Sequence, residues 1–244
     1  MRFADFLGEF SDSFALVDSE KIHKIQKICE DSILKKKEGD IDTDEVLKIK
    51  ALIRKTEARS AALSMGVLHE NIHFLDLPFY QTGLIKKSEL SKVDIEISKK
   101  ILRDIQPEEI YAAGDLTDPH GTHRKCLEAF IKAFDELMEE DLPWVKKCQV
   151  YLYRGAWQEW DIETVEKAVP LTPEEMHMKR LAIFRHQSQK DRALFPGIDS
   201  REFWQRAEER NRETADLFNK LGLPEYEAIE LFVTLRVLRK IMKF

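Results

Sequence analysis

The stretch of sequence that decides the fold is "YAAGDLTDPHGTHRKCLEAF", residues 111–130. It starts as an apolar run typical of a buried strand, passes through an Asp-Pro turn and continues with the periodicity of a helix. Two histidines, His120 and His123, lie where that helix begins. Because ligands of open α/β sheets bind outside the carboxyl ends of the strands, the sequence places both histidines at a ligand-binding edge.

Outward from this segment, apolar runs and helical patterns alternate. Short apolar runs bounded by turn residues predict strands at 71–77, 108–114 and 148–154. Helical patterns lie between them at 92–105 and 122–140. This alternation predicts an α/β fold of the Rossmann-like kind, in which a mostly parallel sheet is flanked by helices.

The two ends of the chain carry helical patterns instead of strand patterns. These patterns cover residues 19–37 and 42–65 before the first strand, and 172–189, 200–221 and 225–242 after the last. Because no strand pattern precedes residue 71, either an N-terminal part of the sheet is missing or the first segments are helical additions to it. We expect one α/β domain over residues 1–195, with a helical C-terminal extension over 196–244 packed on it.

The composition excludes several classes of protein. The 244 residues are 43% hydrophobic and 34% charged, with a net charge of -6, a balance typical of globular domains. Acidic and basic residues are interleaved without a basic stripe, which argues against a nucleic-acid partner. No apolar run reaches transmembrane length and no signal peptide begins the sequence, so we expect no membrane contact and a cytoplasmic location. Three widely spaced cysteines argue against a disulfide framework and a cysteine zinc site.

The two histidines leave two interpretations open. The N-terminus of a helix favours neutral imidazole, which is the form of histidine that binds metal. A hydrolytic zinc site needs three protein ligands and an open position for water. The neighbouring Asp118 could serve such chemistry or cap its own turn. However, the His-x-x-His spacing also arises by chance, and histidines in turns are more often hydrogen-bonded surface residues.

Four segments in order resemble the motifs of one family, the PIG-L/LmbE zinc-dependent de-N-acetylases. "DPHGTHRKC" resembles the second motif of this family, which reads roughly His-x-x-His followed by a helix. "IRKTEARSAALSMGV", "NIHFLDLP" and "KRLAIFRHQSQ" resemble its Arg-x-x-Glu helix, its Leu-x-Leu-Pro turn and its late His-x-Ser-Gln motif. "YRGAWQEWDIE" and "FPGIDS" look closest to a bacterial subgroup in which this domain follows a glucosamine-6-phosphate deaminase-like domain.

The resemblance implies roles for the residues of the turn. His123 matches a zinc ligand, and His120 matches the histidine that stabilises the oxyanion or protonates the leaving amine. We assign Asp118 to the catalytic group beside His120. Thr122 stands where the family often has an aspartate that orients this histidine. Whether His120 is held in the orientation that catalysis needs therefore stays open.

Two further positions outside the turn match residues near the sugar. Arg54 matches a position that can face the substrate, although an ion pair with Glu57 on the helix surface explains it equally well. His186 belongs to the late motif at the rim of the pocket, for which we favour a structural role. Trp157, Trp160 and Trp204 could stack on a sugar, but tryptophans at this density are more often core or interface anchors.

The first motif of the family, Ala-His-Pro-Asp-Asp, lies at the end of its first strand and is absent from this sequence. The resemblance therefore implies an incomplete zinc site and a partial domain over residues 1–195, in which the first two strands of the family are missing. With that motif supplied, we expect a zinc-dependent hydrolase that removes the acetyl group of an N-acetylglucosamine-type substrate, within a glucosamine-6-phosphate deaminase-like polypeptide. The alternative is a non-catalytic interaction or regulatory module. Missing strands leave a sheet edge open, which predicts a homo-oligomer or association with another polypeptide. Sugar-phosphate binding alone is disfavoured, because no glycine-rich phosphate loop occurs.

Overall fold

The computed structural model describes eight stretches of the chain, which form two compact units. The described residues are 3–14, 19–37, 40–80, 88–114, 121–155, 158–189, 201–223 and 225–242. The first unit comprises Met1–Phe74, Gln81–Ile85 and Leu181–Asp191, and the second comprises Leu75–Tyr80, Lys86–Arg180 and Arg192–Phe244. The predicted domain boundary at residue 195 lies outside the described residues, so that division stays a prediction.

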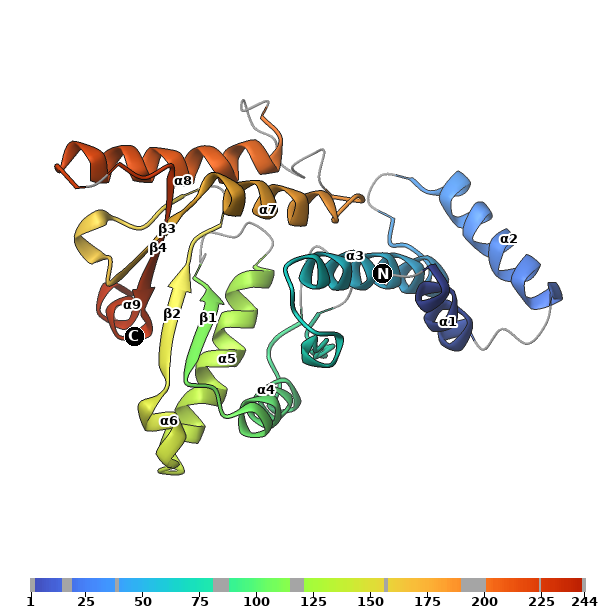
Figure 1. The fold of residues 1–244 in the computed structure, drawn as a ribbon. Helices are drawn as coiled ribbons and strands as arrows, with labels where there is room; N and C mark the ends of the chain where they lie inside the picture. Colours follow the sequence, from blue (N-terminus) through green and yellow to red (C-terminus); the bar gives the residue numbers. More distant parts are fainter. Residues whose placement is uncertain are drawn as a thin grey trace. The chain divides into compact units, whose positions relative to one another are not determined.

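The first unit is helical in its described part. It contains α1 (Phe3–Phe14), α2 (Ser19–Lys35), α3 (Asp44–Ser64) and the short 3-10 helix η1 (His69–Asn71) (Figure 1). Both α1 and α2 contact α3, whose Val46, Leu52 and Ala61 are buried. The turn after α3 passes through Gly66, whose φ of 86° is in the region that glycine adopts without strain. The helices predicted at 19–37 and 42–65 are therefore confirmed.

The strand predicted at 71–77 is wrong. Residues 69–71 form η1, and residues 72–77 take no regular structure. Asp76 has a φ of 48°, a left-handed conformation that no strand ladder accommodates. The following turn is instead anchored to a helix, because the Phe79 amide donates to Oδ1 of the fully buried Asp94 at 2.9 Å.

The second unit is built on a four-stranded mixed sheet in the order β1-β2-β4-β3. The strands are β1 (Glu109–Ala113), β2 (Gln149–Tyr153), β3 (Lys167–Leu171) and β4 (Ala228–Thr234). β1 pairs with β2 in parallel, whereas β4 is antiparallel to both β2 and β3. The predicted α/β class, with helices flanking a sheet, is confirmed. The predicted mostly parallel pairing is corrected to a mixed sheet, because β4 runs against both of its neighbours.

The helix predicted at 225–242 is wrong over its first half. Residues 228–234 form β4, and only α9 (Leu235–Met242) is helical. Ile229, Leu231 and Val233 alternate with half-buried residues, as expected for a strand between two neighbours. Apolar residues this close together fit both periods over a short run, and pairing with β2 and β3 selects the strand. The strand β3 was not predicted either.

Three helices of the second unit agree closely with the predicted ranges, namely α4 (Lys92–Ile105), α5 (Thr122–Glu139) and α8 (Phe203–Lys220). The helix predicted at 172–189 is shorter, because α7 (Pro173–Phe184) ends five residues earlier. The short α6 (Pro143–Lys147) and the 3-10 helix η2 (Ile162–Thr164) were not predicted. Ser91 and Asp94 form a capping box that fixes the first turn of α4. Among the described helices, none is both long and apolar enough to cross a bilayer.

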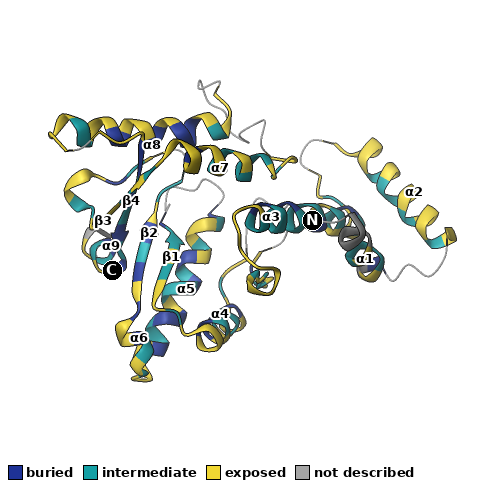
Figure 2. Ribbon diagram, viewed as in Figure 1, coloured by how far each residue is buried: buried dark blue, intermediate teal, exposed yellow. Residues whose placement is uncertain are grey.

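The core of the second unit lies on one face of the sheet. Val150, Leu152 and Leu231 of the strands form one buried hydrophobic cluster with Leu137 of α5 and Leu238 of α9. Figure 2 shows buried segments on the strands of this unit. The opposite face is half-exposed and aromatic. Tyr111 stacks on Tyr151 with ring centroids 5.3 Å apart, and the ammonium of Lys167 lies over both rings. The buried face fixes the ends of β1 and β2, where the candidate site begins.

Candidate functional site

The carboxyl ends of β1 and β2 meet at one edge of the sheet. Ala113 pairs with Tyr153, and the next amide, that of Gly114, donates to the Tyr153 carbonyl at 2.7 Å. The chain after β1 leads to α5, while the chain after β2 leads through Arg154 to Trp160. We call this region the carboxyl edge. The strand and helix predicted around the two histidines are confirmed, at 109–113 and 122–139.

Of the residues predicted to act at this edge, the structure describes one. His123 is exposed in the first turn of α5, which follows Gly121 with its φ of 67°. Asp118 and His120 lie in residues 115–120, outside the described part of the chain. Within the described ranges, no three His, Cys, Asp or Glu side chains are grouped so that they could hold a metal ion. The described residues therefore offer zinc one candidate donor and do not assemble a site, so the zinc stays a prediction.

Trp160 is a structural anchor of the carboxyl edge. Its side chain is 7% exposed, and its Nε1 donates to the Leu152 carbonyl at 2.9 Å. The guanidinium of Arg154 lies 4.4 Å above its ring. A Cβ at Gly114 would approach Cζ2 of Trp160 to 2.8 Å, so the glycine is what lets the ring lie against the end of β1. The preferred core interpretation is confirmed for Trp160, whereas Trp157 lies outside the described residues.

Behind this edge lies a group of four charged side chains and one asparagine that sequence reasoning missed. We call Glu159, Lys179, Arg210, Asn211 and Glu230 the ionic cluster. Glu230 of β4 accepts from Lys179 Nζ at 2.6 Å and from Arg210 Nη2. Asn211 accepts from Lys179 at 2.7 Å and donates to the Ile229 carbonyl at 2.8 Å. Nothing local in the sequence marks these residues as buried.

The ionic cluster holds the chain that leaves β2. Arg210 Nη1 donates to the carbonyls of Arg154 and Gly155, at 2.7 and 3.1 Å. The Arg210 side chain is only 9% exposed, so these bonds are largely shielded from water. A guanidinium has several hydrogen-bond donors in a fixed planar geometry. Arg210 can therefore bind two carbonyls and a carboxylate at the same time. Arg210 thereby fixes the start of the loop that carries Trp160.

The two carboxylates of the cluster have pKa values shifted in opposite directions. Burial tends to raise the pKa of Glu230, but the charges of Lys179 and Arg210 and the hydrogen bonds prevail and lower it. Burial raises the pKa of Glu159, and the nearby Arg210, with Nη1 3.6 Å from Oε2, offsets this only in part. Oε2 of Glu159 is buried without a hydrogen-bond partner among the described residues.

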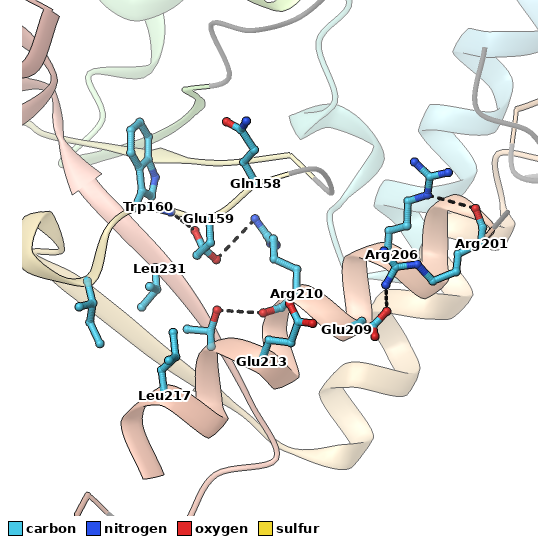
Figure 3. Close-up of a pocket in the computed structure, with 12 residues that line it drawn as sticks. Gln158, Glu159, Trp160, Arg201, Arg206, Glu209, Arg210, Glu213, Leu217 and Leu231 are labelled. Carbon is cyan, nitrogen blue, oxygen red and sulfur yellow. Dashed lines mark hydrogen bonds and ion pairs between the residues drawn. The ribbon is translucent and has the colours of Figure 1, made fainter. Parts of the chain in front are cut away.

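A pocket of about 240 Å³ opens beside Glu159. Figure 3 shows the segment 158–160 on one side of it and the side chains of α8 on the other. Its walls combine charged groups with the apolar side chains of Leu217 and Leu231. Trp160 borders both this pocket and Gly114, so the pocket is a neighbour of the carboxyl edge within the same unit.

In the first unit, two of the recognised motifs contact each other. Glu57 of α3 is 8% exposed, and its two carboxylate oxygens accept from the amide and the hydroxyl of Ser188, both at 2.7 Å. The Arg-x-x-Glu helix and the His-x-Ser-Gln segment therefore contact each other, although 131 positions of sequence separate Glu57 from Ser188. Arg54 and His186 are both half-buried in this unit, and their contacts with a substrate stay predictions.

Replacing Glu57 with glutamine is expected to lower the free energy of unfolding of the first unit by about 1–2 kcal/mol. The NH2 group of the glutamine replaces one carboxylate oxygen, so one of the two hydrogen-bond donors of Ser188 loses its acceptor. Ser188→Ala should cost about 1 kcal/mol, and the double variant should lose less than the sum. Urea denaturation followed by circular dichroism measures all three. Strict additivity would contradict the pairing, and the exposed Glu70→Gln is the matched control.

Comparison with known proteins gives one relationship over nearly the whole chain. No protein-family model matches the sequence. A protein of Bacteroides thetaiotaomicron, which carries the provisional name glucosamine-6-phosphate deaminase-like protein, is 49% identical over 237 residues. The match covers 96% of this chain and 35% of that protein, so the chain spans about a third of the length of this curated relative.

Proposed function

We propose that this chain is the part of an amino-sugar-processing polypeptide that contributes the carboxyl edge to a de-N-acetylase site. The name of the 49% identical relative supports the amino-sugar theme, since it describes a glucosamine-6-phosphate deaminase-like protein. The resemblance of four ordered motifs to de-N-acetylases supports the finer activity. The observation that carries the proposal is the position of His123, in the first turn of the helix that follows a parallel strand.

The substrate in this proposal is an N-acetylglucosamine-type sugar, and the reaction is hydrolysis of its acetamide. His123 would be one ligand of zinc, with the remaining ligands and the general base supplied from outside the described residues. When bound, zinc would supply a Lewis acid for the acetamide carbonyl and a water of lowered pKa. His120 and Asp118 are proposed to serve the oxyanion and the leaving amine, and Arg54 and His186 the sugar.

The described residues contribute positioning to this reaction. Gly114 allows Trp160 to lie against the end of β1, and Arg210 fixes the two carbonyls that follow β2. Catalytic groups act efficiently when their supporting elements hold them within fractions of an ångström of the productive geometry. The buried contacts of Trp160 and Arg210 hold the chain that follows β2 and thereby support the carboxyl edge.

The test is acetate release by the full-length gene product, with N-acetylglucosamine and its 6-phosphate as substrates. His123→Ala is expected to reduce the rate by about 100-fold or more and to lower the zinc content measured by metal analysis. The exposed His69→Ala in the first unit is the matched control and should change neither quantity. Zinc binding without acetate release, or full activity in His123→Ala, would refute the proposal.

A second candidate, a non-catalytic module that docks to another polypeptide segment, is favoured by one observation. Within the described sheet, β1 is a terminal strand, so one side of it has no strand beside it there. Such an edge pairs readily with another strand. Size-exclusion chromatography with light scattering separates this candidate: a monodisperse monomer that binds zinc stoichiometrically would count against it.

A further inference from the structure

Glu159 holds one carboxylate oxygen away from both water and hydrogen-bond donors. Its side chain is 16% exposed, and its Oε2 is closed to solvent without a hydrogen-bond partner among the described residues. The guanidinium of Arg210 lies nearby, but its Nη1 is 3.6 Å from Oε2, too far for a hydrogen bond (Figure 3). An ionised oxygen in this position is unfavourable, because it has given up water without gaining a donor.

The other oxygen of Glu159 ties the carboxyl group to the carboxyl edge. It accepts from the Trp160 amide at 2.9 Å. Trp160 in turn donates through Nε1 to the Leu152 carbonyl and lies against Gly114 at the end of β1. If the carboxyl group of Glu159 turned away, the Trp160 amide would lose this acceptor. The orientation of one carboxyl group is thereby linked to the packing of the carboxyl edge.

The pocket beside Glu159 gives the carboxylate a hydrated place to turn into. Its volume of about 240 Å³ is well above the roughly 10–15 Å³ that one water molecule requires. Glu159 lines this pocket, so rotation about its own side-chain bonds suffices to bring Oε2 into water. The start of the segment need not move, because Arg210 holds the carbonyls of Arg154 and Gly155.

Charged groups face Glu159 from α7, α8 and β4, and its own segment carries Arg154, whose guanidinium lies 4.4 Å above the adjacent indole ring. Burial raises the pKa of Glu159 most, Glu230 raises it further, and Arg210 and Lys179 lower it only in part. The pKa of Glu230 is itself lowered, so Glu230 stays ionised while Glu159 titrates. The pocket wall adds two cations and two anions, whose formal charges cancel, namely Arg201, Arg206, Glu209 and Glu213.

We propose that Glu159 is a pH-sensitive latch on the carboxyl edge: its neutral carboxyl group holds the Trp160 amide, whereas its carboxylate turns into the pocket and releases that amide. The closed form binds the proton more strongly than the open form, in which water surrounds the group. The closed form is therefore fully favoured below 4.5, the ordinary pKa of a glutamate, and is lost as the pH rises through the raised pKa of Glu159. The latch needs neither metal nor substrate and does not depend on the proposed activity.

The test is hydrogen exchange of the full chain, followed by NMR between pH values of about 4 and about 8. The measured quantity is the protection factor of the Trp160 amide, which divides out the intrinsic exchange rate at each pH. We expect this factor to fall at least about threefold as the pH rises, and the protection of the indole N–H to fall with it. In Glu159→Gln, whose side chain cannot ionise, both should keep the high values of the acidic range.

Two controls separate the latch from general unfolding. Glu163→Gln changes an exposed carboxylate four positions from Glu159 and should keep the pH dependence. The amide of Cys148, which donates to the Trp144 carbonyl at 3.0 Å just before β2, should keep its protection over the same range.

The pH profile of the original chain decides the matter even if Glu159→Gln fails to fold. Protection of the Trp160 amide that does not change with pH, or that changes equally in Glu159→Gln, would overturn the latch. An equal loss at Cys148 would do the same, since it would show unfolding of the whole unit. A fall at the amide with the indole N–H unchanged would overturn the link to the carboxyl edge.

Discussion

Replacing Glu230 with alanine is expected to lower the free energy of unfolding of the second unit by about 3–5 kcal/mol. Glu230 is the shared carboxylate of Lys179 and Arg210, and its side chain is 14% exposed. The substitution removes this partner from Lys179 and Arg210, whose side chains are 29% and 9% exposed. Removing one member of a buried ion pair is strongly destabilising, because the remaining charge has lost both water and its partner.

Tryptophan fluorescence during urea denaturation measures this loss selectively. All four tryptophans belong to the second unit, so the signal does not report the first. The matched control is Glu227→Ala, which removes a carboxylate from an exposed pair with Arg212. That control should cost less than about 1 kcal/mol. Equal losses in the two variants would show that the ionic cluster is not buried in solution.

The second large effect is expected from Gly114→Val at the end of β1. A Cβ there would lie 2.8 Å from Cζ2 of Trp160, 3.0 Å from Cβ of Leu152 and 3.3 Å from the Tyr153 carbonyl. Two of these atoms belong to buried side chains and the third to the backbone, so none of them moves aside easily. Overfilling of a packed core typically costs 1–3 kcal/mol, and we expect about 3 kcal/mol here because the added branch enlarges the clash.

The cause of that loss can be isolated with a double-mutant cycle. In a Trp160→Leu background the largest contacting ring is gone, so Gly114→Val should cost about 1 kcal/mol less than in the original chain. The remaining three tryptophans still report unfolding of the same unit. If the valine costs the same in both backgrounds, the ring of Trp160 does not lie against Gly114. The same variants should change acetate release in the full-length product, since the carboxyl edge depends on this packing.

Much of the fold follows from local patterns in the sequence. Helices α4 and α5 begin at the predicted residues 92 and 122, and β1 and β2 lie inside the predicted runs. Local periodicity and turn residues suffice there, since each of these elements is bounded by clear signals. They do not suffice for β3 and β4. Ile229, Leu231 and Val233 fit a strand as well as a helix, and only pairing with neighbouring strands selects between them.

The sequence by itself determined the two elements that flank the candidate site, the strand β1 and the helix α5 with His123 in its first turn. The roles of His120 and His123 stay predictions. The sequence also ordered the four recognised motifs along the chain. Only the tertiary structure decided that Glu57 holds Ser188, that Trp160 lies against Gly114, and that Glu230 is shared by Lys179 and Arg210. The reason is physical. Helix and strand periods are local properties, whereas burial of a charge and its choice of partner depend on which distant elements pack together.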